Sequence, residues 1–559
     1  MMEQMKKTLL YAVIITGLSG AMFLPGMGRL PLLDRDEPRF AEAGRHMLAT
    51  GDYLVPYFNN EVRYDKPPAI YWVMTLGYRI FGVNEIGARI GSALAGMASC
   101  LLIFFVAKAM FGSRVALVAG LAAPLTVLVF IESRIATADA LLLLSIMLMF
   151  WGMWRVREGH RGLTDYGMIY GALALGSLTK GPVPMAVMAA ACLSEGFLHG
   201  LTAGQGIADR IKSSLREFIV ILRQYRAAPG IAAAALIVML WFIPAVIRTD
   251  GGFLRDGFYH HVVDRSFGPE AHESHAGIPV VYYILLLPLT FFPWFAFLPA
   301  GIRTVRRMNP SAAGFLFAWA IAPFLVFSFL RTKLPHYVMP GYPALIIISA
   351  AGLAEAMRSR ENIWKPIWGK FGLTAFLLVG LAISVGIALA PVLLDTPGHL
   401  LYWLPPASAA LLMTTAAFAG FATARNRFGY TAIVVMMAAT IGLFASVTLP
   451  TVGGKYYMYR DVAGDIVSVC PETETVATLG GAEPSLIFYL SREGISVVPS
   501  GSSSIDDVIA EHEHLLILAR GERMSLPRER GGVMVMEFPR CLNTAKARWD
   551  ELTLWKMAP

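Results

Sequence analysis

Long apolar runs, each close to twenty residues and separated by short polar loops, fill most of the first 450 residues of this chain. An α-helix needs about 20 mainly apolar residues to cross the hydrocarbon core of a bilayer. Charged residues make up only 15% of the 559 residues, whereas a soluble domain carries roughly 25%. We therefore expect a membrane protein, and exclude a soluble enzyme, a disordered protein and a disulfide-rich secreted module.

The apolar runs predict about thirteen transmembrane helices. The first run follows Lys6 and Lys7 and lacks a small-residue cleavage site, so we expect a retained span rather than a signal peptide. The shorter stretch 69–82 is expected to lie along the membrane surface. The expected spans lie near residues 8–26, 87–111, 114–131, 139–155, 165–179, 182–199, 230–248, 278–300, 312–330, 338–357, 371–391, 402–422 and 428–449.

The distribution of Lys and Arg predicts how these helices are oriented. Loops that thirteen spans place in the cytoplasm are basic, for example 155–161, 210–226 and 303–307, while the opposite loop 392–401 has no Lys or Arg. The positive-inside rule then predicts a cytoplasmic N-terminus and an outer C-terminus. We assign the formal net charge of +8 to these loops and to a phosphate site, not to nucleic-acid binding.

The composition changes after residue 450. The segments TETVATLG, GISVVPS, HLLILAR and GGVMVMEF have strand patterns, and PSLIFYLSR and SIDDVIAEHEH have helix patterns. This alternation predicts a small α/β domain over 451–559, outside the membrane, beside a transmembrane domain over 1–450. Cys470 and Cys541 both fall in the small domain, where an oxidising compartment would favour a disulfide; two buried free thiols are the alternative.

Charged residues gather at the span ends of the predicted outer side. In the first outer loop, 27–86, Asp34 and Glu37 fit a capping role at a helix start, while Asp36 and Arg39 could share one helix face. Asp139 begins a long apolar run, where an acid either caps the helix or has a function. Cations from four separate segments are expected on this side and together suit the phosphate of a lipid headgroup: Lys66, Lys180, Arg265 and Lys333.

The second large outer loop, 249–278, is rich in histidine. His272 and His275 stand three residues apart and, with a carboxylate, are candidates for a structural zinc site. Hydrogen-bonded or solvent-exposed histidines are the alternative, because no HExxH motif is present.

Several of these segments resemble one family. DRDEPRFAEAGRHM, YDKPPAIYW, NEIGARIGSALAG, LTKGP, HVVDRSFG and KLPHYVMPGYPAL are similar to segments of the bacterial lipid A aminoarabinose transferases. Those are integral-membrane glycosyltransferases of the GT-C fold, related to protein O-mannosyltransferases. The resemblance implies transfer of 4-amino-4-deoxy-L-arabinose from undecaprenyl phosphate to lipid A phosphates at the periplasmic face of the bacterial inner membrane. It also implies resistance to polymyxin and other cationic antimicrobial peptides.

The resemblance and the shared side of the membrane assign roles to eight side chains. The catalytic pair is Asp36 and Asp139. Lys66 and Arg265 match positions that hold the donor phosphate, although this chain reads DRSF where related enzymes usually keep Arg directly before Phe. The complete substrate-binding set is Arg39, Lys66, Lys180, Arg265, Lys333 and Tyr337.

The chemistry of the implied reaction limits what Asp36 has to do. An acceptor phosphate monoester has a second pKa of about 6, so it is mostly ionised at neutral pH and needs little help from a general base. Asp36 is then expected to bind the sugar's ammonium group or to position the acceptor. Neither a nucleotide nor a catalytic metal is required, because the lipid phosphate faces protein cations directly.

Two other functions fit part of the pattern. A glycosyltransferase of the same fold with another polyprenyl-linked sugar, or with a protein acceptor, shares most of these features. A lipid transporter or flippase also has many spans, but transporters often show paired internal repeats, and this sequence has none that we detect.

Overall fold

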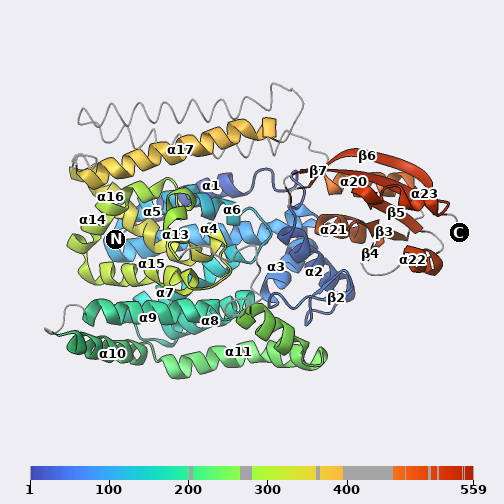
Figure 1. Cartoon of the computed structure of the whole chain (residues 1–559). Coiled ribbons are helices and arrows are strands. Elements are labelled where there is room, and N and C mark those ends of the chain that lie inside the picture. Colours follow the sequence, from blue (N-terminus) through green and yellow to red (C-terminus); the bar gives the residue numbers. More distant parts are fainter. Residues whose placement is uncertain are drawn as a thin grey trace.

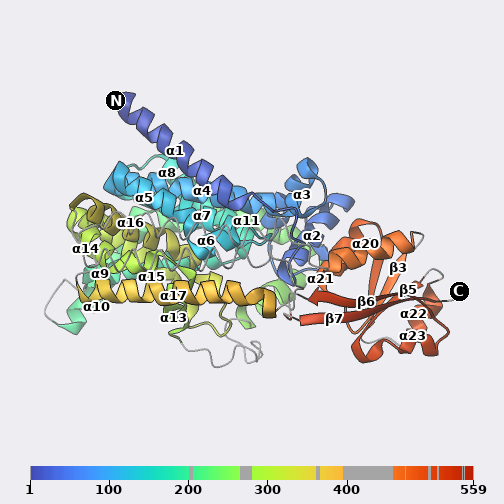
Figure 2. The ribbon, with the colours of Figure 1, turned by 90° about the horizontal axis from the view of Figure 1, so that it is seen from above.

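The computed structural model describes residues 2–200, 206–264, 280–359, 366–393, 458–471, 474–500, 505–512, 515–543, 546 and 548–557. Most of the helices form one elongated body, and the C-terminal strands and helices lie beyond one end of it (Figure 1). The first helix, α1 (Met2–Phe23), begins at the side away from the C-terminal domain and runs toward it (Figure 2). The start of the chain and its C-terminal domain therefore lie at opposite ends of the molecule.

Six helical segments in the described residues are long and apolar enough to cross a membrane. A seventh would arise if α13 (Tyr282–Thr290) and the following segment Trp294–Met308 form one span, although they are bent by 105°. Pro288 and Pro293 lie at this bend, where each lacks a backbone N–H for the helix ladder. The six are α4 (Glu85–Phe111), α7 (Asp139–Arg157), α9 (Val183–Gly200), α11 (Ala227–Arg248), α15 (Pro310–Ser328) and the segment Pro335–Arg358, which includes most of α16 (Tyr342–Ser359).

The expected count of thirteen spans is not confirmed within the described residues. The run 114–131 is broken into α5 (Ser113–Ala122), a 3₁₀ turn (Ala123–Leu125) and α6 (Val127–Glu132), with Pro124 at the break. The runs near 8–26 and 165–179 form α1 and α8 (Leu163–Lys180). These two helices, which contain charged residues, are not among the six segments that are long and apolar enough to cross a membrane. The run near 371–391 lies in α17 (Ile367–Leu393), and the expected spans 402–422 and 428–449 lie outside the described residues.

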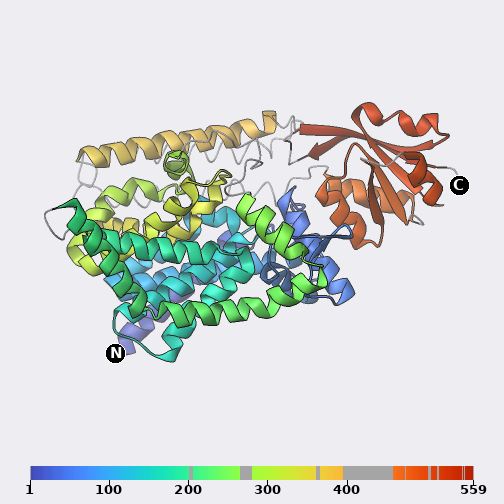
Figure 3. The same ribbon diagram turned by 60° about the horizontal axis from the view of Figure 1, so that its bottom comes forward.

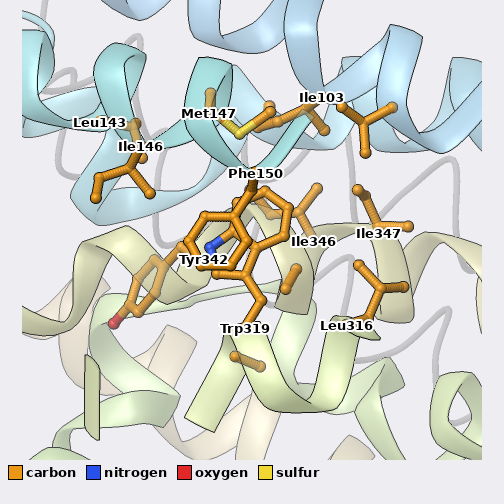
Figure 4. Packing of buried hydrophobic residues seen from close by; sticks show 14 of the residues in the cluster. Ile103, Leu143, Ile146, Met147, Phe150, Leu316, Trp319, Tyr342, Ile346 and Ile347 are labelled. Atoms are coloured by element: carbon orange, nitrogen blue, oxygen red, sulfur yellow. The ribbon is translucent and has the colours of Figure 1, made fainter. Parts of the chain in front are cut away.

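Aromatic packing holds the centre of the helical body together. The rings of Phe150 on α7 and Trp319 on α15 stack with centroids 4.4 Å apart and planes 4° apart. Figure 4 shows this pair among aliphatic side chains such as Ile103 and Ile346, from α4 and α16. The indole N–H of Trp319 donates to the carbonyl of Pro340 at 2.8 Å, so its polar atom is satisfied in the core.

The first outer loop folds into two helices and a hairpin beside the body. These are α2 (Asp36–Thr50), strands β1 (Tyr57–Phe58) and β2 (Glu61–Val62), and α3 (Ala69–Phe81), so the helix expected over 69–82 is present. Asn59 and Asn60 form the two-residue hairpin turn with φ of 51° and 65°. Such a turn needs positive φ at both central positions, which Asn tolerates better than most residues. Figure 3 shows this loop at the end of the body nearest the C-terminal domain.

A buried ion pair fixes the start of α2 to α4. Arg89 donates to both carboxylate oxygens of Glu37 at 2.8 Å, and it also donates to the carbonyls of Met27, Leu30 and Pro31. Glu37 also accepts from the backbone N–H of Ala136 at 2.7 Å. The capping role considered for Glu37 is therefore incomplete, because this carboxylate joins three separate segments of the chain.

The C-terminal domain contains a five-stranded mixed sheet in the order β4-β3-β5-β7-β6. β3 (Thr475–Leu479), β4 (Ser496–Ser500) and β5 (Leu515–Arg520) are parallel, while β6 (Val533–Asn543) and β7 (Arg548–Lys556) pair antiparallel. The strands and helices expected from the sequence are present, including α21 (Pro484–Arg492) and α22 (Ile505–Glu511). β7 and α20 (Tyr459–Val469) are additional elements.

The expected disulfide between Cys470 and Cys541 is absent, and both thiols are free. Cys541 is buried on β6 and belongs to the apolar core beneath α20, while Cys470 follows the last turn of α20 and is only partly buried. Ion pairs between charged side chains connect the elements of this domain. Arg520 donates to Glu483 at 3.0 Å and to Asp550 at 3.1 Å.

Candidate active site

A polar cavity of about 820 Å³ opens at the end of the helical body nearest the C-terminal domain. Its walls come from the first turn of α2, the β1–β2 hairpin, the segment 131–139, the end of α8 and the segment 334–337. Six of the eight side chains assigned from the sequence line it, although they are far apart in the chain: Asp36, Arg39, Lys66, Asp139, Lys180 and Tyr337.

Asp36 and Arg39 present unpaired charges to this cavity. Both lie in the first turn of α2, with Asp36 exposed and Arg39 half-buried. Neither makes a hydrogen bond or an ion pair with another residue in the described part of the chain. Both side chains are thus available to a ligand.

Lys66 faces the cavity from the loop before α3. Its ammonium donates to Asp65 Oδ1 at 2.8 Å, and Arg63 holds the other carboxylate oxygen at 3.0 Å. Burial lowers the pKa of Lys66, and Asp65 opposes that shift. Two cations thus share one acid at this point, which leaves positive charge for an incoming anion.

Asp139 and Lys180 form a close pair across the cavity. Lys180 Nζ donates to Asp139 Oδ1 at 2.6 Å, and the same ammonium lies 5.0 Å from the centre of the Tyr337 ring. Asp139 is the first residue of α7, and Ala138 occupies the N-cap position without a side-chain cap. The N-capping interpretation of Asp139 is therefore wrong. Its carboxylate lines the polar cavity and accepts the hydrogen bond from Lys180.

A second, apolar cavity of about 670 Å³ adjoins the polar one. Its walls are mostly aliphatic and aromatic side chains of α8, α9 and α11, such as Leu173, Val238 and Phe242. Five residues line both cavities: Tyr64, Asp65, Lys66, Lys180 and Tyr337. The two lysines therefore stand where a polar space meets an apolar one.

Of the remaining expected site residues, the structure describes only Lys333. Lys333 is buried but lines neither cavity, because its ammonium turns back to the carbonyl of Leu330 at 2.6 Å while Thr332 and Leu334 face the cavities. Lys333 thus lies outside the walls of both cavities, and its role in substrate binding stays a prediction. Arg265, His272 and His275 lie outside the described residues. Within the described ranges, no group of three His, Cys, Asp or Glu side chains is arranged to hold a metal ion.

The cavity residues missing from the sequence-based set include Glu132 and His336. Glu132 lies at the end of α6, and His336 lies directly before Tyr337; both face the polar cavity. Both stand within seven residues of an assigned site residue, in ESRIATAD and KLPHYV. Their closeness in the chain to assigned site residues was therefore the sequence signal that could have identified them.

The C-terminal domain reaches this cavity through Asp34. The backbone N–H of Ser485 donates to Asp34 Oδ1 at 2.8 Å, and the Ser485 hydroxyl donates to Oδ2 at 2.5 Å. Ser485 lies in the first turn of α21, where helix N–H groups favour an anion. Burial raises the pKa of Asp34 to about 6, although both bonds from Ser485 lower it. A helix of the C-terminal domain thus holds the segment that leads to Asp36.

Replacing Ser485 by Ala should weaken this contact at neutral pH. A hydrogen bond to an ionised group is worth roughly 1.5–3 kcal/mol, and the Asp34 carboxylate loses its bond from the Ser485 hydroxyl. We expect Ser485→Ala to lower the unfolding temperature of the purified protein, with the exposed Ser468→Ala as control. Below pH 6 this loss of stability should shrink, because a protonated Asp34 no longer makes a charge-assisted bond. An equal loss at pH 5 and pH 8 would contradict this.

Comparison with known proteins shows what the chain resembles. Residues 65–222 match the family described as dolichyl-phosphate-mannose-protein mannosyltransferase. The undecaprenyl phosphate-alpha-4-amino-4-deoxy-L-arabinose arabinosyl transferase of Edwardsiella ictaluri is 30% identical over 68% of this chain and 65% of its own length. The corresponding enzyme of Enterobacter sp. is 28% identical over 76% of this chain and 73% of its own length. These relatives confirm the resemblance seen in the motifs, and the chain spans only about two thirds of the first of them.

Solved structures show the same fold. The crystal structure of ArnT from Cupriavidus metallidurans bound to undecaprenyl phosphate superposes with a TM-score of 0.72, covering 98% of this chain and 97% of that one, at 20% identity. The apo form of that protein gives a TM-score of 0.71. The helical body and the small C-terminal sheet domain therefore form a GT-C fold, as expected from the sequence.

Proposed function

We propose, from the kinship of this chain with aminoarabinose transferases and its ArnT-like fold, that it is a glycosyltransferase with a lipid-phosphate-linked sugar donor. The donor is undecaprenyl phosphate carrying 4-amino-4-deoxy-L-arabinose, and the acceptor is a phosphate group of lipid A. The reaction takes place at the periplasmic face of the inner membrane of a bacterium, with the N-terminus in the cytoplasm. Capping the lipid A phosphates lowers their negative charge and so confers resistance to polymyxin.

The single observation that carries this proposal is the position of Lys66 and Lys180 at the border of the two cavities. A polyprenyl-phosphate sugar has an apolar tail, a charged phosphate and a polar sugar in that order. Its tail suits the apolar cavity, its phosphate suits the two ammonium groups, and its sugar suits the polar cavity. A soluble nucleotide sugar has no group for the apolar space.

The charges of the polar cavity support transfer from such a donor. Negative charge develops on the leaving phosphate as the glycosidic bond breaks, and the ammonium groups of Lys66 and Lys180 stabilise it. Arg39 and Asp36 line the same cavity from α2, without a hydrogen bond or ion pair among the described residues, and are available to position an acceptor phosphate. An ionised acceptor phosphate attacks without losing a proton, so no strong base is required.

The match of residues 65–222 to protein mannosyltransferases favours one other candidate, a protein acceptor. A Ser or Thr hydroxyl must lose its proton during attack, and Asp36 would then act as the general base. The chemical identity of the acceptor separates the two functions.

Mass spectrometry of lipid A tests the proposal. A host that makes the donor lipid should gain aminoarabinose on lipid A when this gene is expressed, and an Asp36→Asn variant serves as the inactive control. Unmodified lipid A together with newly glycosylated periplasmic protein would favour the mannosyltransferase-like function. Unmodified lipid A and unmodified protein would reject both.

Lys66→Ala should weaken donor binding by about 10-fold or more. A buried phosphate would lose a charge-assisted partner worth roughly 1.5–3 kcal/mol. The measurement is the KM for undecaprenyl-phosphoaminoarabinose, and Arg265→Ala is expected to act on the same step. Lys333→Ala is the matched control, because Lys333 is a buried lysine that faces neither cavity. An unchanged donor KM in the Lys66 variant would remove it from the phosphate site.

A further inference from the structure

Glu132 is a buried acid that forms no ion pair with a Lys or Arg of the described residues. It is 5% exposed and lines the polar cavity from the end of α6. Its Oε2 accepts from the Thr137 hydroxyl at 3.1 Å, and its Oε1 lies 3.6 Å from His336 Nδ1, beyond a normal hydrogen bond. Among the described residues no Lys or Arg makes an ion pair with it.

Three other buried or partly buried acids of this cavity are paired, whereas Asp36 is exposed and unpaired among the described residues. Glu37 is held by Arg89, Asp65 by Lys66 and Arg63, and Asp139 by Lys180. A buried carboxylate without a cation is costly, since burial removes its water without replacing the lost interactions. Glu132 therefore differs from these three acids, because no Lys or Arg of the described residues forms an ion pair with it.

His336 connects Glu132 to the lysine at the cavity border. Its Nδ1 faces Glu132 and its Nε2 lies 3.8 Å from Asp139 Oδ2, while Asp139 binds Lys180 through its other oxygen. With a neutral imidazole, Asp139 is matched by Lys180, and no Lys or Arg among the described residues forms an ion pair with Glu132. A cation bound beside Glu132 would therefore stabilise the ionised form of this buried carboxylate.

We propose that Glu132 binds the ammonium group of the donor sugar and thereby selects amino sugars over neutral ones. This inference rests on the proposed function, which places the donor phosphate at Lys66 and Lys180. The 4-amino group lies across the pentose ring from the anomeric carbon that carries the phosphate. A sugar anchored by its phosphate at Lys180 thus directs its ammonium past His336 toward Glu132. Asp36, which the sequence left as a second candidate for the ammonium, is assigned to the acceptor side on α2.

The test compares two donors that differ only in this group. They are undecaprenyl phosphate linked to 4-amino-4-deoxy-L-arabinose and undecaprenyl phosphate linked to L-arabinose. Glu132→Gln keeps the size of the side chain and removes its charge. We expect it to raise the KM for the amino donor by about 10- to 100-fold, as for a lost charge-assisted hydrogen bond, and to leave the KM for the neutral donor nearly unchanged.

Two further variants separate binding from folding. Glu132→Asp should keep most of the preference for the amino donor, because the charge is retained. Glu61→Gln is the matched control, since Glu61 is an exposed acid on β2 that lines the same cavity. An equal loss of both donors in Glu132→Gln, or an unchanged preference, would overturn the inference.

A binding experiment tests the inference independently of sugar transfer. It measures, by thermal shift, how the same two lipids bind to the purified full-length protein. If the amino lipid binds preferentially and this preference requires Glu132, the inference holds even when no sugar is transferred. If transfer occurs but Glu132→Gln binds both lipids as the wild type does, the proposed function holds and the inference fails.

Discussion

Replacing Asp36 by Asn should abolish sugar transfer while the protein stays folded in the membrane. Asp36 is exposed in the first turn of α2, lines the polar cavity and makes no hydrogen bond or ion pair with the described residues. Its loss therefore breaks no internal contact, so the effect should fall on the reaction alone. Acid–base and positioning groups contribute about 10²- to 10⁴-fold to catalysis, and we expect a loss of this size.

The measurement is the initial rate of aminoarabinose transfer to lipid A at saturating donor, together with the unfolding temperature. Glu61→Gln removes a carboxylate from the same cavity and should retain activity. Near-normal lipid A modification by the Asp36 variant would remove this residue from the mechanism. A large fall in unfolding temperature would instead reveal a structural role.

Replacing Arg89 by Met should cause the largest loss of stability. The Arg89–Glu37 pair is almost fully buried, with side chains 2% and 3% exposed. Removing one partner of a buried pair costs roughly 3–5 kcal/mol, because the other charge remains buried without compensation. Three backbone carbonyls, of Met27, Leu30 and Pro31, would lose their donor as well.

Unfolding of the detergent-purified protein and its yield from the membrane would show this effect. Arg114→Met is the control, since Arg114 is exposed at the start of α5. The double variant Arg89→Met, Glu37→Gln should recover part of the stability, because no orphaned charge remains and the amide still accepts hydrogen bonds. A double variant less stable than Arg89→Met alone would refute this account.

Much of the helical body could be predicted from the sequence because hydropathy is a local property. The run 87–111 became α4 and the run 139–155 became α7, with ends that differ by a few residues. The prediction failed where local backbone chemistry interrupts an apolar run, as at Pro124 between α5 and α6. It also missed α20 and β7, whose short segments carry a weak local signal before they pack in the C-terminal domain.

The candidate site was predictable in part. Asp36, Arg39, Lys66, Asp139, Lys180 and Tyr337 all line one cavity, and their segments share one predicted side of the membrane and match the motifs of one family. Lys333 shared the same side, yet its side chain turns to the Leu330 carbonyl. The direction of one side chain in an irregular segment depends on its neighbours in space. The free thiols of Cys470 and Cys541 show the same limit, since sequence spacing contains no distance.

The sequence by itself determined that this chain is built from membrane-length apolar helices and that its reactive charges gather at one set of helix ends. Both follow from transfer free energies that add up residue by residue along the chain. Only the tertiary structure decided which of those charges are satisfied. Glu37 meets Arg89 across 52 positions, Asp34 meets Ser485 across 451, and Glu132 forms no ion pair with a Lys or Arg of the described residues. The energy of each charge depends on distance and on lost hydration, which exist only once the helices have packed.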